Sequence, residues 1–379
     1  MAQRQTKSAE LSNRRSSRVT AREVAEKLGI STMTVSRVMN NRANVDGRTR
    51  ERVLEAARKM GYSPNRIAKS LVLRRTNTIG VVVPEITHSF FPEAIRGIEE
   101  VAYQAQYRLI LMHSAESADR EKDAILALES ERVDGILIST AQSVEDYELY
   151  KRVIQSGLPV VFFDRCVQGI GASCVGIDDK ESAHRMTSHL AGHGYDRIAH
   201  LCGPQKVSIG RLRLEGFKLA LKERNIPCDE RLIVESGFQE TGGTTAMIRL
   251  LDLPARLRPR AVVAVNDPAA FGAIKAIAER GLRIPDDIAI VGFSDDIRAA
   301  LMPAPLTTIH QPAYDVGRKA AQKLVAIVEG KSTTVENIVI PAEEVIRQSC
   351  GRSHKNLPAQ IAPMQVDRIH ELMGLRTRE

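Results

Sequence analysis

The chain has 379 residues, with 54 Lys and Arg against 46 Asp and Glu, which gives a net charge of +8. Hydrophobic residues make up 43% and charged residues 26%, an ordinary globular composition that excludes wholesale disorder and predicts two or three domains. No apolar run approaches the ~18 residues of a membrane helix, the N-terminus lacks the apolar centre of a secretory signal, and tryptophan is absent. We therefore expect a protein without membrane contact, in which stacking of aromatic side chains on bases plays little part.

The positive charge is concentrated in the first 75 residues, which hold 18 basic and 6 acidic side chains. The other 304 residues are slightly acidic, with 36 basic and 40 acidic side chains. A small basic module in front of a near-neutral body is typical of a nucleic-acid-binding head attached to another domain. The alternative is a basic solubilising tail, so the decision depends on whether these charges lie on a folded motif.

Residues 1–18 are polar, basic and aperiodic, and we expect them to be disordered. Helical spacing begins after Thr20, which opens a capping box, and Gly29 ends this first helix. Ser31 can cap a second helix over residues 32–39. Two short helices joined by a tight turn form a helix-turn-helix, whose second helix enters the major groove of DNA.

The second helix has an apolar and a polar side. Val35, Val38 and Met39 follow helical spacing and would face the core. The outward side chains offer a guanidinium for guanine, hydroxyl and amide groups for base edges, and methyl groups for thymine. They are Thr32, Met33, Ser36, Arg37 and Asn40. The alternative is the solvent-facing side of an ordinary helical hairpin.

A third helix is expected from about Asp46 to Gly61, so that residues 19–63 can close a minimal core. Its inner side would consist of Val53, Leu54, Ala57 and Met60. Hydroxyl groups near the helix N-termini are placed to meet phosphates, at Thr20, Ser31 and Thr49.

In the body of the chain, short β-branched runs alternate with helical patterns. Strands are expected at residues 79–83, 109–112, 135–138, 160–163, 198–202, 261–265 and 288–292. Helices are expected at residues 92–105, 118–131, 145–156, 180–192, 211–224, 242–251, 268–280 and 315–329. The alternation predicts an α/β fold with parallel sheets covered on both faces, and the number of strands favours two lobes. Ligands of such folds bind beyond the carboxyl ends of the strands, in a cleft that two hinged lobes can close.

Motifs in both parts of the chain carry a resemblance to a known family. The head contains VTAREVAEKLGISTMTVSRVMNNRANVDGRTRERVLEAARKMGYSPNRIAKSL, and the body contains GLPVVFFDR, GHGYDRIAHLCGP, RLRLEGF and VNDPAAFGAIKAIAERG. From residue 19 to about 350 the chain resembles the lactose/galactose-repressor (LacI/GalR) family of transcriptional regulators. The resemblance implies an all-α helix-turn-helix head and a two-lobed core like that of periplasmic sugar-binding proteins, with two parallel doubly wound sheets.

The resemblance also implies that the chain crosses between the lobes three times, so that each lobe is discontinuous. The expected parts are a basic tail (1–18), the DNA-binding domain (19–63), a hinge helix and linker (64–77), a first lobe (78–177 and about 310–335), a second lobe (178–309 and about 336–350) and a C-terminal tail (351–379). The C-terminal tail has fewer than two heptads of apolar residues, which favours a dimer over the tetramer that some relatives form.

In the family, the hinge segment folds when two subunits sit on operator DNA. A leucine matching Leu71 then enters the minor groove and kinks the duplex at the centre of the site. The alternative for Leu71 is a buried position between domains. Together with the helix-turn-helix, the resemblance gives the following expected DNA contacts: Ala21, Thr32, Met33, Ser36, Arg37, Asn40, Asp46, Thr49, Tyr62, Asn65, Ala68 and Leu71.

The resemblance places a small-molecule effector, a sugar or sugar derivative, between the lobes. The expected contacts are Phe90, Phe91, Asp164, Arg213, Phe238, Asn266, Ser294 and Asp295. The planar fork of Arg213 suits vicinal hydroxyls or a carboxylate, although a structural salt bridge is an alternative, as is plain core packing for Phe90 or Phe91. We expect Asp267 to cap the helix that follows it rather than to touch the ligand.

One position departs from the family pattern. Relatives usually have an aspartate two residues after the glycine that ends this strand, whereas this chain has Ser294, followed by Asp295 and Asp296. Either Asp295 replaces the missing carboxylate after a small loop shift, or the ligand needs no carboxylate at this point.

Other chemistry has weaker support. His189 and His193 have a helical spacing that can grip a metal, with His184 nearby, but no acidic or cysteine partner follows at ligand spacing, so we expect no metal site. The five cysteines form no CxxC pair, which predicts reduced thiols rather than a disulfide. No dinucleotide-binding or nucleophile-elbow motif is present, and we expect neither a cofactor nor enzymatic activity.

Together these features predict a transcriptional regulator, by the family's usual outcome a repressor, that binds a pseudo-palindromic DNA operator as a homodimer. An effector in the cleft, either an inducer or a corepressor, would change its affinity for DNA. We expect a cytoplasmic, nucleoid-associated protein. The alternatives are a cytosolic solute-binding protein and an α/β enzyme that acts on a sugar.

Overall fold

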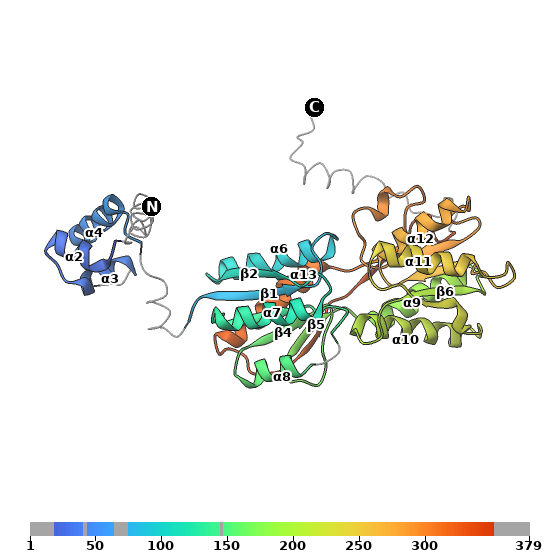
Figure 1. The fold of residues 1–379 in the computed structure, drawn as a ribbon, viewed down its shortest axis with the longest axis horizontal. Helices are drawn as coiled ribbons and strands as arrows, with labels where there is room; N and C mark the ends of the chain where they lie inside the picture. The colour runs from blue at the N-terminus through green and yellow to red at the C-terminus, as the bar shows by residue number, and fades with distance from the viewer. Residues whose placement is uncertain (1–18, 41–43, 64–74, 145–146, 352–379) are drawn as a thin grey trace, which may run out of the picture. The chain divides into compact units, whose positions relative to one another are not determined.

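The computed structural model describes residues 19–40, 44–63, 75–144 and 147–351 (Figure 1). The chain divides into two compact units, Met1–Thr76 and Asn77–Glu379. The expected basic tail, the C-terminal tail and the hinge residues Asn65, Ala68 and Leu71 lie outside the described residues. Within the described part, no helix is both long and apolar enough to cross a membrane.

The first unit contains three helices, α2 (Ala21–Leu28), α3 (Thr32–Met39) and α4 (Gly47–Met60). The expected capping box is present, because Thr20 Oγ1 accepts a hydrogen bond from the backbone N–H of Glu23 and Thr20 N–H donates to the Glu23 carboxylate. The side chain of Ser31 caps α3. Gly29 and Gly61 end α2 and α4 in the left-handed conformation that glycine adopts without strain.

All three helices contribute to the core of this unit, through Val24, Ala25, Val35, Val38, Val53 and Ala56. Leu54 was expected on the inner side of α4, but it is 40% exposed and that prediction is wrong. A residue one position after Val53 is turned about 100° around the helix, whereas Ala56 and Ala57 return to its side.

The first lobe of the second unit is built on a six-stranded parallel sheet in the order β2-β1-β3-β4-β5-β11. Its strands are β1 (Thr78–Val83), β2 (Arg108–His113), β3 (Gly135–Ile138), β4 (Val160–Phe163), β5 (Ser173–Gly176) and β11 (Asn337–Val339). One face is covered by α6 (Phe90–Gln104) and α13 (Ala313–Val328), and the other by α7 (Ala118–Ser130) and α8 (Glu148–Gln155) (Figure 1).

The second lobe has a four-stranded parallel sheet in the order β7-β6-β8-β9. Its strands are β6 (Ile198–Cys202), β7 (Ile233–Glu235), β8 (Ala261–Ala264) and β9 (Ala289–Val291). The helices α9 (Asp179–Gly192) and α10 (Ser208–Glu223) cover one face, and α11 (Glu240–Leu251) and α12 (Asp267–Glu279) cover the other. An antiparallel pair, β10 (Thr308–His310) and β12 (Glu343–Val345), lies beside β9, and two 3-10 turns, η1 (Glu230–Leu232) and η2 (Ala299–Leu301), complete the lobe.

The α/β class with two parallel doubly wound sheets is confirmed. The third crossing between the lobes comes later than expected. Residues 337–339 pair with β5 and extend the first lobe's sheet, although the segment from about 336 was expected in the second lobe. The free edge of β5 offers these residues backbone hydrogen bonds before the chain leaves for β12.

Two glycines bring α6 and α13 into backbone contact. A Cβ atom on Gly97 would lie 2.1 Å from the carbonyl oxygen of Tyr314, and one on Gly317 would lie 2.0 Å from that of Ala94. Only glycine permits this approach from both sides. The first lobe is therefore closed over one face of its sheet by a tightly joined helix pair.

Candidate functional site

The polar side of α3 is exposed in the head. The exposed side chains are those of Thr32, Met33, Ser36 and Arg37, whereas Val35 and Val38 are buried. Met33 is 62% exposed despite its apolar side chain. Within the described residues, Arg37 makes no hydrogen bond or ion pair, so its guanidinium is available to an outside acceptor.

Several other predicted DNA contacts already have structural partners. The amide of Asn40 donates to the carbonyl oxygen of Ser36 at 2.8 Å. Asp46 caps α4, since its carboxylate accepts the N–H of Thr49 at 2.9 Å, and this bond lowers the pKa of Asp46. Ala21 and Tyr62 are half-buried against the head core. Thr49 is also half-buried.

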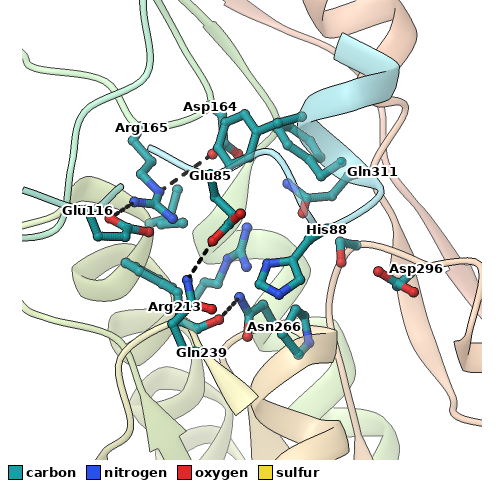
Figure 2. A pocket seen from close by; sticks show the side chains of 16 residues that line it. Glu85, His88, Glu116, Asp164, Arg165, Arg213, Gln239, Asn266, Asp296 and Gln311 are labelled. Carbon is teal, nitrogen blue, oxygen red and sulfur yellow. Dashed lines mark hydrogen bonds and ion pairs between the residues drawn. The ribbon is translucent and has the colours of Figure 1, made fainter. Parts of the chain in front are cut away.

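In the second unit, a pocket lies between the strand ends of the two lobes (Figure 2). It encloses about 490 Å³, including space that is open to solvent. The lining residues are Glu85, His88, Phe90, Phe91, Glu116, Asp164, Arg165, Ile209, Arg213, Phe238, Gln239, Asn266, Pro268, Ser294, Asp296 and Gln311.

The polar residues of the pocket follow the carboxyl ends of parallel strands, which meet at one edge of each sheet. Glu85 follows β1, Glu116 follows β2, Arg165 follows β4, and Asn266 follows β8. These positions could have been named from the predicted strands alone. Two further lining residues could not, because they follow strands that the sequence did not predict: Gln239 after β7 and Gln311 after β10.

Strained backbone gathers at the same edge. Glu116 and Asp164 have φ angles of 59°, and Ser294 has a φ of 115°, in the region that favours glycine. Such conformations cost free energy and persist where the surrounding structure holds them, which is common at ligand sites.

Seven of the eight predicted effector contacts line the pocket, and Asp295 does not. The Asp295 carboxylate lies 2.7 Å from Nη2 of Arg347 and 3.2 Å from Nδ1 of His310. These partners hold its carboxylate away from the pocket lining, so the pocket does not support the alternative in which Asp295 replaces the family aspartate. Asp296 lines the pocket instead, beside Ser294.

Arg213 combines the two roles that the sequence left open. Its side chain is fully buried, its Nε lies 2.8 Å from Asp179 Oδ1, and its Nη1 donates to the carbonyl oxygen of Val265 at 2.5 Å. The guanidinium carbon is 4.0 Å from the ring centre of Phe293. Arg213 is thus a structural ion-pair partner that also borders the pocket.

Arg165 and Glu116 form a second ion pair, with Nη1 and Oε2 2.8 Å apart (Figure 2). The Arg165 guanidinium also lies over the ring of Phe238, 4.2 Å from its centre. Oε1 of Glu116 and Nε of Arg165 are buried and have no hydrogen-bond partner within the described residues. The pair therefore offers one acceptor and one donor to a ligand.

Two other carboxyl groups of the pocket differ in their protonation. Burial raises the pKa of Asp164 to about 6, although Arg165 and Arg213 act in the opposite direction. Burial alone would also raise the pKa of Glu85, but hydrogen bonds from Thr87 and Ile86 outweigh it and hold the pKa at about 2. Glu85 is therefore the firmly charged carboxylate of the two.

Hydrogen bonds connect the two lobes at the rim of the pocket. Ser89 Oγ donates to Asp296 Oδ2 at 3.0 Å. Gln239 Nε2 donates to Glu85 Oε2 at 3.2 Å (Figure 2). Each bond joins a residue of the first lobe to one of the second. A ligand that competes for these groups changes the contact between the lobes.

Asn266, not Asp267, caps α12, so the prediction for Asp267 is wrong. The Asn266 side-chain oxygen accepts the N–H of Ala269 at 2.9 Å, and its amide donates to the carbonyl oxygen of Phe238 at 2.9 Å. Asp267 is buried and accepts hydrogen bonds from Thr308 and from the backbone of Asp296. Its burial raises the pKa of the Asp267 carboxyl to about 7.

One disulfide contradicts the expectation of reduced thiols. Cys166 and Cys174 are bonded, with their Cα atoms 5.8 Å apart. Cys166 follows β4 and Cys174 lies in the adjacent β5, so the sheet brings together two cysteines that no short motif connects. The remaining thiols are those of Cys202, Cys228 and Cys350.

Comparisons with known proteins found a matching family model for each of the two units. The family model for bacterial regulatory proteins of the lacI family matches residues 20–65, and the periplasmic binding protein-like domain matches residues 187–350. The HTH-type transcriptional repressor PurR of Mannheimia succiniciproducens is 34% identical over 331 residues, which cover 87% of this chain and 98% of the relative. The chain belongs to the LacI family.

Solved structures of LacI-family proteins support the same conclusion. The lac repressor dimer bound to operator and the anti-inducer ONPF is 27% identical, with a TM-score of 0.78, and the match covers 88% of this chain and 99% of that one. A CelR–cellobiose complex is 29% identical, with a TM-score of 0.67 and coverage of 88% and 100%. This LacI-family protein is therefore a DNA-binding transcriptional regulator that responds to a small molecule, and its relatives are regulators rather than enzymes.

Proposed function

We propose that this LacI-family protein is a non-catalytic repressor whose effector is a neutral, polyhydroxylated molecule such as a sugar. The observation that carries this proposal is a pair of buried atoms, Glu116 Oε1 and Arg165 Nε, that lack a hydrogen-bond partner among the described residues, although Arg165 Nε lies 3.9 Å from Asp164 Oδ2. The guanidiniums of the pocket are already ion-paired. A hydroxyl group can donate to Glu116 Oε1 and accept from Arg165 Nε.

The charge of the pocket argues against an anionic effector. Four carboxyl groups line it, those of Glu85, Glu116, Asp164 and Asp296, against the guanidiniums of Arg165 and Arg213. Each guanidinium already has a carboxylate partner within 2.8 Å. A ligand carboxylate or phosphate would be desolvated among these acids without a free cation, which is costly. The apolar face of a sugar ring can instead pack on the phenylalanine rings.

The effector would act through the contact between the lobes. The hydrogen bonds Ser89–Asp296 and Gln239–Glu85 favour one arrangement of the lobes in the free protein. A ligand that prefers another arrangement shifts the equilibrium by no more than its difference in affinity for the two states. The shift in the arrangement of the lobes would raise or lower the affinity of the protein for DNA.

For DNA, we propose that Thr32, Met33, Ser36 and Arg37 on α3 contact the bases, and that the surrounding basic residues contact phosphates. Two heads of a homodimer would bind a pseudo-palindromic operator in the cytoplasm, with the Leu71 pair at its centre. Exposed apolar side chains, such as Tyr103 at 77% and Leu111 at 45%, support a subunit contact on the core.

A gel-shift selection from a pool of genomic fragments tests this proposal. We expect the full chain to retain a few fragments that share an inverted repeat, and to bind them as a dimer in sedimentation. Retention of no fragment at moderate salt would favour a solute-binding protein or an enzyme instead. The selected fragment then serves as the operator in all further assays.

The effector class is tested by thermal shift with neutral aldoses and disaccharides beside their aldonic acids. We expect a neutral sugar to raise the melting temperature and to change operator affinity, because a ligand that binds only the native state stabilises it. A shift that occurs only with the acids would overturn the assignment of a neutral ligand.

Glu116→Gln tests the role of the pocket directly. The substitution keeps the shape of the side chain but removes its charge, and we expect the effector's affinity to fall by about tenfold or more, since charge-assisted hydrogen bonds contribute about 1.5–3 kcal/mol. Glu129→Gln is the matched control, because Glu129 forms a comparable ion pair with Arg152 at the surface. Equal effects of the two variants would exclude Glu116 as a ligand contact.

A further inference from the structure

Three potential metal ligands meet on the second lobe, in a cluster formed by His189, His193 and Cys350. One ligand atom from each residue can be chosen so that all three lie within 4.8 Å of one another. The two histidines come from the end of α9, and the cysteine comes from the last part of the described chain, more than 150 residues later. Sequence spacing alone could not show this meeting, since it depends on the folded lobe.

The backbone holds these residues in place from both sides. The N–H of His193 donates to the carbonyl oxygens of His189 and Leu190 at the end of α9. Cys350 follows Ser349, whose side chain donates to the carbonyl oxygen of Ile290 in β9 at 2.6 Å. The N–H of Ile290 donates back to the Ser349 carbonyl at 2.8 Å. The thiol of Cys350 itself donates to the carbonyl oxygen of Arg347 at 3.5 Å, so binding an ion would exchange this weak contact for a bond to the metal.

The ligand atoms lie somewhat farther apart than in a formed tetrahedral site. Zinc bonds of about 2.0–2.1 Å to imidazole and about 2.3 Å to thiolate place neighbouring ligand atoms roughly 3.3–3.5 Å apart. The ring centres of His189 and His193 lie 4.7 Å apart, edge to face, and the chosen ligand atoms of the three residues lie within 4.8 Å of one another, so the side chains must move closer together to bind one ion. His193 is exposed and gives an ion a route from solvent, whereas Cys350 is fully buried.

We propose that His189, His193 and Cys350 bind one divalent transition-metal ion, with Zn²⁺ the best fit, at a structural site that joins α9 to the end of the core. Two imidazoles and a thiolate are the borderline-soft donors that zinc and cobalt prefer over magnesium or calcium. Water completes the fourth position at the exposed side. The site is separate from the effector pocket, whose lining includes none of the three residues.

Binding of Co²⁺ to the full chain, purified without a histidine tag and stripped with a chelator, tests this proposal. We expect one ion per chain, visible ligand-field bands of a four-coordinate site, and a near-ultraviolet band from thiolate-to-cobalt charge transfer. Zn²⁺ should displace the cobalt and remove these bands. We also expect Zn²⁺ at a hundredfold excess over Kd to raise the melting temperature of the core by roughly 5 °C.

Variants separate the site from other metal binding. Cys350→Ser should abolish the charge-transfer band, and His193→Ala, at an exposed position that does not threaten folding, should weaken Co²⁺ affinity by more than the roughly tenfold cost of losing a merely supporting contact. Matched controls are Cys228→Ser, at an exposed thiol elsewhere, and His184→Ala, on the same helix but paired with Glu223.

Both controls should bind Co²⁺ as the parent chain does. The proposal is overturned if the parent chain takes up no Co²⁺, if Cys350→Ser keeps the charge-transfer band, or if a control variant loses it. Because the readout is metal binding itself, these outcomes are independent of DNA and effector binding.

Discussion

At the scale of single residues, the head and the pocket differ in how their arginine side chains are exposed and paired. Arg37 is exposed without a partner among the described residues, whereas Arg213 is fully buried and paired. The exposed side of α3 could be predicted from helical periodicity, because Val35 and Val38 fix which side of the helix faces inward. The partner of Arg213 could not be predicted in this way, since Asp179 and Arg213 are brought together by the packing of α9 on α10.

Arg37→Ala should weaken binding to the selected operator by roughly 1–3 kcal/mol per half-site and relax the preference at one base pair. The physical reason is the loss of a bidentate contact to a base edge. Binding to operators with each base substituted in turn measures this preference, with Arg58→Ala on α4 as the control. A uniform loss on every sequence would instead identify Arg37 as a phosphate contact.

Arg213→Ala should lower the free energy of unfolding of the core by about 3–5 kcal/mol, because it leaves Asp179 buried without its partner. Burial raises the pKa of Asp179 even beside Arg213, which shows how strongly this site disfavours a lone charge. Adding Asp179→Asn should recover part of the loss, and urea unfolding of both variants measures it. If the single variant is as stable as the parent chain, the ion pair is not a stabilising element.

At the scale of secondary structure, the core helices and most strands were predictable, and several of the shortest strands were not. The strands β1, β3, β4 and β6 and all the helices of the core were expected within a few residues of their observed bounds. Missed strands such as β7, β11 and β12 have only three residues each, too few for a hydrophobic period to stand out. These segments become strands because their backbone groups pair with the free edge of a neighbouring strand. That pairing depends on the folded sheet and not on the local sequence.

The disulfide belongs to this scale, since it joins the segment after β4 to the adjacent strand β5. Replacing both Cys166 and Cys174 by serine should lower the free energy of unfolding by about 2 kcal/mol, because the bond closes a short loop in the unfolded chain. Thermal unfolding of the oxidised parent and of the double variant measures the difference, with Cys228→Ser as the control. A parent chain whose stability does not respond to reductant would show that the bond is absent in solution.

At the scale of the whole molecule, buried carboxyl groups couple the stability of the core to pH. Glu121 is buried between Tyr150 and the backbone of Ala141, and burial raises its pKa to about 7 although both hydrogen bonds lower it. A carboxyl group whose pKa is raised on folding stabilises the native state most when it is protonated. This contribution is complete below the unfolded pKa of 4.5 and is lost as the pH rises through about 7.

Glu121→Gln should remove this dependence. The stability of the parent relative to the variant should fall between about pH 5 and about pH 7, by at most about 1.4 kcal/mol per pH unit, and then level off. Urea unfolding at a series of pH values measures it, and Glu129→Gln at the surface should show no such trend. A constant difference across this range would mean that Glu121 is ionised throughout.

The interleaved path of the chain has a consequence for its synthesis. A ribosome releases the head first, and its three helices need nothing that follows them. The first lobe, by contrast, has one face of its sheet covered by α6 alone until α13 emerges, after nearly all of the second lobe has been made. The nascent chain must therefore shield an apolar surface for most of translation. A product that stopped before α13 would keep the complete α2–α4 head and the pocket-lining residues but would lack α13 and β11 of the first lobe, so its binding to DNA would no longer respond to the effector.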